Sequence, residues 1–283
     1  MTRPTPNTDP LVAFREAVSV PDSDLDLLVA ALLLSGAERG QPVRVAEYIR
    51  KFERLVAPMA HEVRHSSDPM EALSILNRRL FDELGFQGNV DAYYDPANSY
   101  MDAVIDSRLG IPITLSIVYM EAAKRAGLNV VGIAMPGHFM VRLETLGRGI
   151  MVDPFHAGKI LDPPQFEKYF ASYGMPDSIR EKILTGATAR SILVRMLRNL
   201  RAAYLRDERF ERALGACDRI LIVDPSQDAD LRDRGVLYCR LGQYYLALKD
   251  LSQYLKRRPN AADYDLISDI VKALRLEVQS GSR

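Results

Sequence analysis

Apolar residues recur at helical spacing through most of the first 126 residues. The segments 22–35, 43–63, 68–84, 99–109 and 113–126 each place apolar side chains three or four positions apart, which is typical of amphipathic helices. Proline or acidic residues stand near the start of some of these segments and glycine near the end of others, as helix boundaries favour. The pattern therefore predicts a largely helical N-terminal layer.

The spacing changes from a helical to an extended period after Gly127. Three short runs suit strands: 130–134, 138–143 and 150–153. Gly147-Arg148-Gly149 is expected to turn the chain between the second and the third run. A helical stretch at 165–173 and a linker containing Gly174 and Pro176 follow. Helices that precede an antiparallel sheet indicate an α+β fold.

Matching residue types recur 34 positions apart between residues 191 and 283. The matched pairs are Leu197 and Leu231, Tyr204 and Tyr238, Phe210 and Tyr244, Ala213 and Ala247, Leu214 and Leu248, and Pro225 and Pro259. This period with these residue types is the signature of the tetratricopeptide repeat, a stack of helix hairpins that usually binds another polypeptide. We expect two repeats, a capping helix at 264–278, and a protein partner whose identity the sequence leaves open.

Three segments follow from these patterns. We expect a disordered tail at 1–12, an α+β domain at 13–180 and an all-α repeat region at 186–283. The repeats do not reveal the oligomeric state.

Composition excludes several classes of partner. Lys+Arg and Asp+Glu both number 37, so the formal net charge is zero and the chain lacks the attraction that nucleic acid or an anionic membrane rewards. The N-terminus carries no signal-peptide core, and the longest apolar stretch, 27–34, is too short to span a bilayer. Cys217 and Cys239 both lie in the repeats, where a cysteine usually packs as a small hydrophobe. We expect a cytoplasmic protein with no nucleic-acid partner, no membrane partner and no cofactor.

His138 and Asp153 are the first candidates for chemistry. They stand fifteen residues apart on two consecutive predicted strands, and in a hairpin with an even-length turn an even and an odd position share a face. The order helix, strand, strand resembles the core of the transglutaminase-like (papain-type) superfamily. In that core a Gly-x-Cys starts the helix, a histidine accepts the thiol proton and an aspartate orients the imidazole. The resemblance implies a papain-like core with a small antiparallel sheet.

The nucleophile of that superfamily is missing here. Counting back from the basic end of the helix, Gly-x-Cys falls on Gly110-Ile111-Pro112, and Pro112 has no nucleophilic atom. No cysteine occurs in residues 1–190, and Thr114 and Ser116 are the nearest hydroxyls. His138 and Asp153 therefore become a vestigial pair that holds two strands together.

Longer strings are similar to one bacterial UPF-type family. These are Asn98-Ser99-Tyr100, Arg108-Leu109-Gly110-Ile111-Pro112, Pro136-Gly137-His138-Phe139 and Val152-Asp153-Pro154-Phe155. The family joins a SirB-type transglutaminase-like domain to C-terminal tetratricopeptide repeats and is commonly labelled "regulator of sirC expression". Proline is its usual residue where the superfamily has cysteine. The matching positions Asn98, Tyr100, Arg108, Gly110 and Gly137 become groove or motif residues by this resemblance.

The resemblance implies a noncatalytic regulatory protein, a transglutaminase-like pseudoenzyme with a degenerate groove and a repeat surface that binds a partner. The alternative is a cysteine-independent hydrolase or acyltransferase that uses His138 and Asp153.

A metal site is the other chemical alternative in the sequence. His61-Glu62-Val63-Arg64-His65 satisfies the H-E-x-x-H pattern, in which two histidines one helical turn apart bind zinc and the glutamate acts as base. Arg64 puts a charge in the middle, and Ser66 to Pro69 end the helix without offering a third ligand. His156, three residues after Asp153, could join His138 in a fortuitous site. We expect no bound metal at either place.

Overall fold

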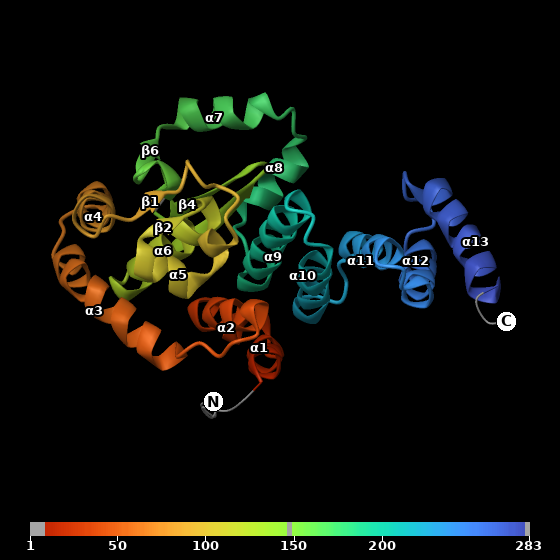
Figure 1. Cartoon of the computed structure of the whole chain (residues 1–283). Helices are drawn as coiled ribbons and strands as arrows, with labels where there is room; N and C mark the ends of the chain where they lie inside the picture. The colour runs from red at the N-terminus through yellow and green to blue at the C-terminus, as the bar shows by residue number, and fades with distance from the viewer. Residues whose placement is uncertain (1–8, 146–148, 281–283) are drawn as a thin grey trace. The chain divides into compact units, whose positions relative to one another are not determined.

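The computed structural model of the protein describes residues 9–145 and 149–280 (Figure 1). The chain divides into two compact units, residues 1–196 and 197–283. The turn expected at Gly147-Arg148 lies outside the described residues, as do residues 1–8 of the expected tail. Among the described residues, no helix combines the length and the apolarity needed to cross a membrane.

Helices build the first half of the N-terminal unit. They are α1 (Pro10–Val18), the 3-10 turn η1 (Asp22–Asp24), α2 (Leu27–Arg39), α3 (Val45–Arg64), α4 (Pro69–Asn77) and the π-helical turn η2 (Arg78–Glu83). Carboxylates of Asp9, Asp26 and Asp68 accept backbone N–H groups at the starts of α1, α2 and α4, as N-caps do. Because α1 begins at Pro10, residues 10–12 are helical, which corrects the expected tail for these three positions.

A buried helix forms the centre of this unit. The short elements β1 (Gln87–Gly88), η3 (Pro96–Ser99), α5 (Met101–Ser107) and β2 (Leu109–Gly110) lead into α6 (Pro112–Arg125). Helix α6 is buried along almost its whole length, so it packs on all sides and is surrounded by α2, α3, α4 and α5. Strands β1 and β2 pair in parallel and bring Gly88 beside Gly110, next to the start of α6.

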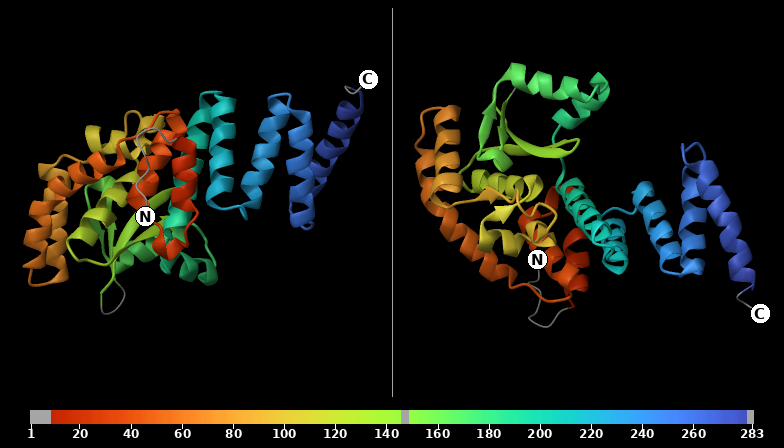
Figure 2. Two further views of the ribbon diagram at one scale, coloured as in Figure 1. Left: turned by 90° about the horizontal axis from the view of Figure 1, so that it is seen from below. Right: turned by 45° about the horizontal axis from the view of Figure 1, so that its top comes forward.

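A four-stranded antiparallel sheet covers α6. Its order is β3 (Val130–Met135), β4 (His138–Leu143), β5 (Ile150–Asp153) and β6 (Lys159–Leu161), with the turn η4 (Pro154–His156) after β5. Figures 1 and 2 place α6 and α7 (Pro163–Ser172) on opposite sides of this sheet, with α8 (Asp177–Leu184) after α7. Phe166 and Phe170 of α7 pack with Ile133, Met135 and Met140 of the sheet. The unit is therefore an α+β fold, as the sequence pattern predicts.

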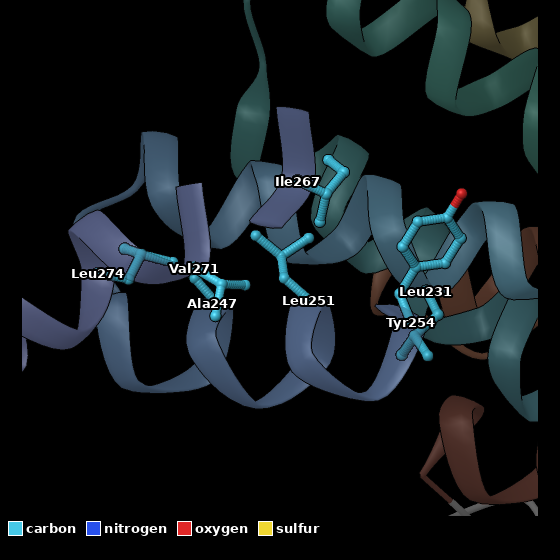
Figure 3. Packing of buried hydrophobic residues seen from close by; sticks show 7 residues of the cluster. All are labelled: Leu231, Ala247, Leu251, Tyr254, Ile267, Val271 and Leu274. Atoms are coloured by element: carbon cyan, nitrogen blue, oxygen red, sulfur yellow. The ribbon is translucent and has the colours of Figure 1, made fainter. Parts of the chain in front are cut away.

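Helix pairs form the C-terminal unit. Helix α9 (Ala189–Arg206) crosses the boundary, and α10 (Phe210–Val223), α11 (Asp228–Arg240), α12 (Tyr244–Arg257) and α13 (Tyr264–Ser280) follow. Seven buried side chains from α11, α12 and α13 make a common core (Figure 3): Leu231, Ala247, Leu251, Tyr254, Ile267, Val271 and Leu274. A Cβ at Gly235 would lie only 2.6 Å from the side chain of Leu251. Small residues thus let α11 and α12 approach closely, as stacked hairpins require.

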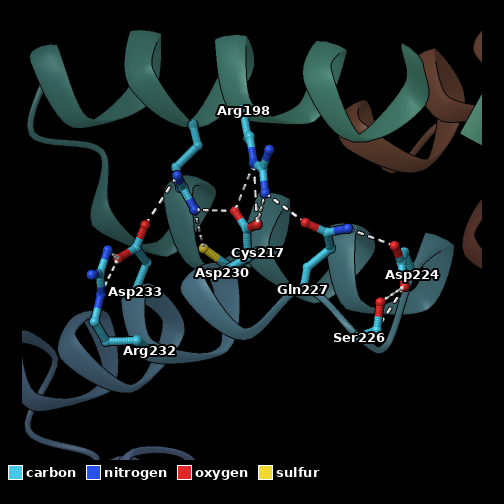
Figure 4. Close-up of polar contacts among 9 residues, drawn as sticks. Arg198, Cys217, Asp224, Ser226, Gln227, Asp230, Arg232 and Asp233 are labelled. Carbon is cyan, nitrogen blue, oxygen red and sulfur yellow. Dashed lines mark hydrogen bonds and ion pairs between the residues drawn. The ribbon is translucent and has the colours of Figure 1, made fainter. Parts of the chain in front are cut away.

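Ion pairs link successive hairpins of this unit. Asp230 of α11 accepts hydrogen bonds from the guanidinium groups of Arg198 and Arg201 on α9 (Figure 4). Thirty-four residues after Arg198, Arg232 pairs in the same way with Asp263, just before α13. The repeat therefore recurs in a polar contact as well as in the apolar core.

Candidate functional site

His138 and Asp153 meet through their side chains. His138 opens β4 and Asp153 ends β5, and the imidazole Nε2 lies 2.8 Å from the Asp153 Oδ2. The sheet register pairs Val141 with Val152, which makes the two residues diagonal neighbours on one face of the hairpin. Both side chains are largely buried, with exposed fractions of 12% and 9%.

His156 contacts the same carboxylate oxygen. Its Nδ1 also lies 2.8 Å from the Asp153 Oδ2, while the backbone N–H groups of Phe155 and His156 donate to the Asp153 Oδ1. Asp153 therefore caps the turn η4 with one oxygen and faces two imidazoles with the other. The side chain of His156 is 61% exposed, so this edge of the cluster is open to solvent.

Side chains of α4 and α6 hold the turn that carries His156. Ala157 and Gly158 both adopt positive φ angles of 53° and 71°, and Gly158 has no room for a Cβ because the Asn77 side chain lies against it. Asn77 donates to the Gly158 carbonyl, and the hydroxyl of Tyr119 donates to the Asn77 Oδ1 at 3.0 Å. This contact chain from α4 and α6 fixes where His156 lies.

Burial and hydrogen bonding act in opposite directions on Asp153. Burial alone would raise its pKa, but the hydrogen bonds and charges of His138 and His156 outweigh burial and hold the pKa of Asp153 below its ordinary value. The carboxylate is therefore ionised near neutral pH and can only accept hydrogen bonds.

Aromatic rings surround the two imidazoles. The ring centroids of Phe155 and Tyr169 lie 6.2 and 6.4 Å from that of His138, and Tyr93 stands edge-on to Phe155. Burial first, and then the neighbouring Tyr173 hydroxyl and the Asp153 charge, raise the pKa of Tyr169 well above its ordinary value. The sequence pattern does not predict Tyr169 at this site, because its position beside His138 depends on how α7 packs on the sheet.

Several motif residues build the start of α6. Pro112 is its first residue, where a missing N–H costs nothing. The Thr114 hydroxyl accepts from the backbone N–H of Ile111 and donates to the carbonyl of Asn98 at 2.8 Å. A Cβ at Gly110 would lie 2.8 Å from this hydroxyl, so glycine lets the strand approach the helix.

The other motif residues have structural contacts of their own. The Asn98 amide donates to the carbonyls of Ala92 and Tyr93, which holds the preceding loop. Gly137 turns β3 into β4 with φ at 67°. Tyr100 lies under the guanidinium of Arg39, and Arg108, with φ at 66°, covers the Phe86 ring.

Ser116, the other hydroxyl considered as a nucleophile, is also buried. Its Oγ lies 3.5 Å from the carbonyl of Phe139, which follows His138 on β4. The first turns of α6 therefore lie against the start of β4, and neither the Thr114 hydroxyl nor the Ser116 hydroxyl reaches solvent.

The H-E-x-x-H residues lie at the end of α3. Glu62 pairs with both Arg78 and Arg79, and the Nδ1 of His65 lies 2.8 Å from the carbonyl of His61. The carboxylate that serves as base in zinc sites with this motif is here paired with two cations, and one imidazole nitrogen contacts the backbone.

Comparison with known proteins adds family evidence to this geometry. Residues 46–198 match the model of the transglutaminase-like superfamily, and residues 200–272 match a tetratricopeptide repeat model. A "UPF0162 protein" of Xylella fastidiosa is 36% identical over 91% of this chain and 92% of its own length. A "UPF0162 protein" of Vibrio cholerae is 28% identical over 91% of this chain and 97% of its own.

A SirB1 protein also occurs among these relatives. The "Protein SirB1" of Salmonella typhimurium is 26% identical over 79% of this chain and 82% of its own length. No solved structure matches the chain. The matches cover both units, so the chain belongs to the SirB1/UPF0162 family, in which a transglutaminase-like domain precedes tetratricopeptide repeats.

Proposed function

We propose that this protein is a noncatalytic regulatory protein of the cytoplasm that binds a partner polypeptide through its repeats. The transglutaminase-like region around His138 would be a second, degenerate contact surface. The proposal rests chiefly on Pro112, because the residue aligned with the superfamily nucleophile has no atom that can attack a substrate. Repeats of this kind generally mediate protein–protein interaction, which supports the choice of a polypeptide partner.

The cysteine content supports the same proposal. Both cysteines lie in the repeat unit, and burial raises the pKa of Cys217 to about 11, so this thiol is a poor nucleophile near neutral pH. Neither cysteine belongs to the residues 1–190 that contain His138 and Asp153.

A cysteine-independent hydrolase or acyltransferase is the second candidate function. The hydrogen bond between His138 and Asp153 favours it, because a base oriented by a carboxylate is part of such an active site. Thr114 and Ser116 would have to supply the nucleophile, yet both are fully buried and bonded to backbone carbonyls.

Partner capture with surface variants tests the first function. The full-length protein serves as bait in an extract of the organism that encodes it, and co-purifying proteins are quantified. Tyr245 on α12 is 71% exposed, so Tyr245→Ala should weaken capture of a specific partner without unfolding the repeats. Val90→Ala removes an equally exposed apolar side chain from the N-terminal unit and serves as control. The repeat-binding proposal fails if both variants retain the same proteins.

An activity assay separates the two candidates. Fluorogenic amide and ester substrates and an amine acceptor are offered to the wild type and to His138→Ala. We expect no turnover that depends on His138. Turnover at enzyme-like rates that His138→Ala abolishes would establish the second function instead.

A further inference from the structure

We propose that His138, Asp153 and His156 together bind a divalent transition-metal ion. This goes beyond the proposed function, which requires no metal. One possible ligand atom from each of the three residues lies within 4.8 Å of the other two. Two imidazoles and one carboxylate form the donor set that proteins use for Zn²⁺ and Fe²⁺.

The distances suit a bound ion. Metal–ligand bonds of about 2.0–2.2 Å place neighbouring ligand atoms roughly 3.0–3.4 Å apart. Each imidazole nitrogen now lies 2.8 Å from the Asp153 Oδ2, so each of these two nitrogen–oxygen distances needs to lengthen by only about half an ångström to admit the ion. Each imidazole would then keep its proton on the other ring nitrogen.

The carboxylate is oriented before any ion arrives. The Asp153 Oδ1 accepts two backbone N–H groups of the turn η4, which leaves Oδ2 directed at both imidazoles. Asn77 holds the far end of the same turn through the Gly158 carbonyl. Metal sites depend on such outer contacts, which fix ligand direction.

The fold itself does not account for His156. The single contact from His138 suffices to tie β4 to β5, whereas His156 adds an exposed imidazole to an oxygen that already has a partner. An ion held by all three groups uses both imidazoles. The solvent-exposed side of His156 gives the ion a path in, and three protein ligands leave coordination positions open for water or a further ligand.

Metal titration of the full-length protein tests the proposal. The protein carries no affinity tag, is stripped with a chelator and is titrated with Co²⁺, whose visible absorption reports coordination, and with Zn²⁺ by calorimetry. We expect one equivalent to bind. Loss of an outer contact typically costs about 10–100-fold in affinity, so loss of a ligand in His156→Gln or His138→Gln should weaken binding at least tenfold.

The chain supplies a matched control. It has only four histidines, and the other two, His61 and His65, form the second histidine pair. The double variant His61→Gln/His65→Gln should bind the ion as the wild type does. Absence of stoichiometric binding overturns the proposal, and so does binding that the double variant loses while His156→Gln retains it.

The metal titration gives a result that depends neither on the stability of His138→Gln nor on the partner-binding proposal. His156 is largely exposed, so His156→Gln decides the matter even if His138→Gln proves unstable in a thermal melt. The titration contains no partner protein. If no metal binds, only the metal proposal fails. If no partner is captured, only the partner-binding proposal fails.

Discussion

Replacement of Asp230 tests how the repeats are held together. Its side chain is 1% exposed, and each carboxylate oxygen accepts from a guanidinium: Oδ1 from Arg201 at 2.6 Å and Oδ2 from Arg198 at 3.1 Å (Figure 4). Asp230→Asn keeps the shape but removes the negative charge and turns an amide N–H₂ toward one of the two cations. The variant therefore places a buried amide N–H donor against a guanidinium N–H donor, and neither can accept a hydrogen bond from the other.

The expected loss follows from burial and from the partners that remain. Breaking a buried ion pair on one side typically costs about 3–5 kcal/mol. Arg198 is 39% exposed and keeps Gln227, and Arg201 keeps Asp233, so we expect a smaller loss of about 2–3 kcal/mol. That corresponds to a roughly 30- to 150-fold rise in the unfolding equilibrium constant of the repeats.

Cys217 offers a local reporter for this measurement. It is fully buried and its Sγ lies 3.6 Å from the Arg201 guanidinium, so pulsed alkylation in a Cys239→Ser background labels it when the repeats unfold. The urea midpoint of labelling should fall by about 1–3 M for a slope of about 1–2 kcal/mol per M.

Asp269→Asn is the matched control for the same experiment. It removes the same charge at a side chain that is 74% exposed and pairs with Lys272, so it should cost less than about 0.5 kcal/mol. Equal losses in Asp230→Asn and Asp269→Asn would refute the reasoning that the buried carboxylate stabilises the stacking of the repeats.

Other parts of the chain allow independent tests. Thr114→Val removes the hydroxyl that bonds the Ile111 N–H and the Asn98 carbonyl, so the free energy of unfolding should fall by about 2 kcal/mol in chemical denaturation. Thr114→Ser keeps a hydroxyl and should cost less. Pro112→Cys should show no robust transglutaminase activity with a fluorescent amine, because a thiol alone does not supply an oxyanion hole or an aligned substrate channel; enzyme-like rates would contradict this. Burial opposes ionisation of Asp106. The hydrogen bonds from Lys51 and from the Tyr48 hydroxyl outweigh burial, so the pKa of Asp106 lies below its ordinary value. The stability that Asp106 adds should therefore be present above its ordinary pKa of about 3.9 and disappear as pH falls below it; Asp106→Asn should cost less than about 1 kcal/mol at pH 7 and nothing measurable at pH 2 by urea unfolding.

Local patterns predicted the main elements because those elements are long or strongly periodic. The runs at 130–134, 138–143 and 150–153 appear as β3, β4 and β5, and the 34-residue period appears as stacked helix pairs. Alternation of apolar and polar side chains depends only on neighbours in the chain, so it can be read without knowledge of the fold.

Elements that depend on distant partners were missed. The pair β1 and β2 has two residues in each strand and exists because Gln87 pairs with Leu109 although η3 and α5 lie between them in the chain. The stretch after Gly174 suggested a linker, yet Pro176 precedes the helix α8. Ile183 and Leu184 of this helix pack against the apolar side chains that the sheet and α7 share. Proline before a helix resembles proline in a linker when only the sequence is considered.

The candidate site also combines a feature that local spacing predicts with one that depends on distant residues. Hairpin parity predicted that His138 and Asp153 could share a face, since that inference needs only the strand period. The approach of His156 to the same oxygen depends on the conformation of the turn that Asn77 holds, eighty-one residues before Gly158. The spacing of three between Asp153 and His156 was the one available signal, and by itself it does not distinguish a turn from a ligand pair.

The two roles of Asp153 determine whether the His138–Asp153 pair indicates catalysis. One oxygen caps the turn η4 and the other ties β5 to β4, so the fold has a structural use for this pair in a region, residues 1–190, that contains no cysteine. Presence of the pair therefore does not by itself distinguish catalysis from a structural role. An exposed His156 directed at the same oxygen has no such structural use, so the metal titration of His156→Gln is the experiment that separates a remnant of an active site from a site with chemistry of its own.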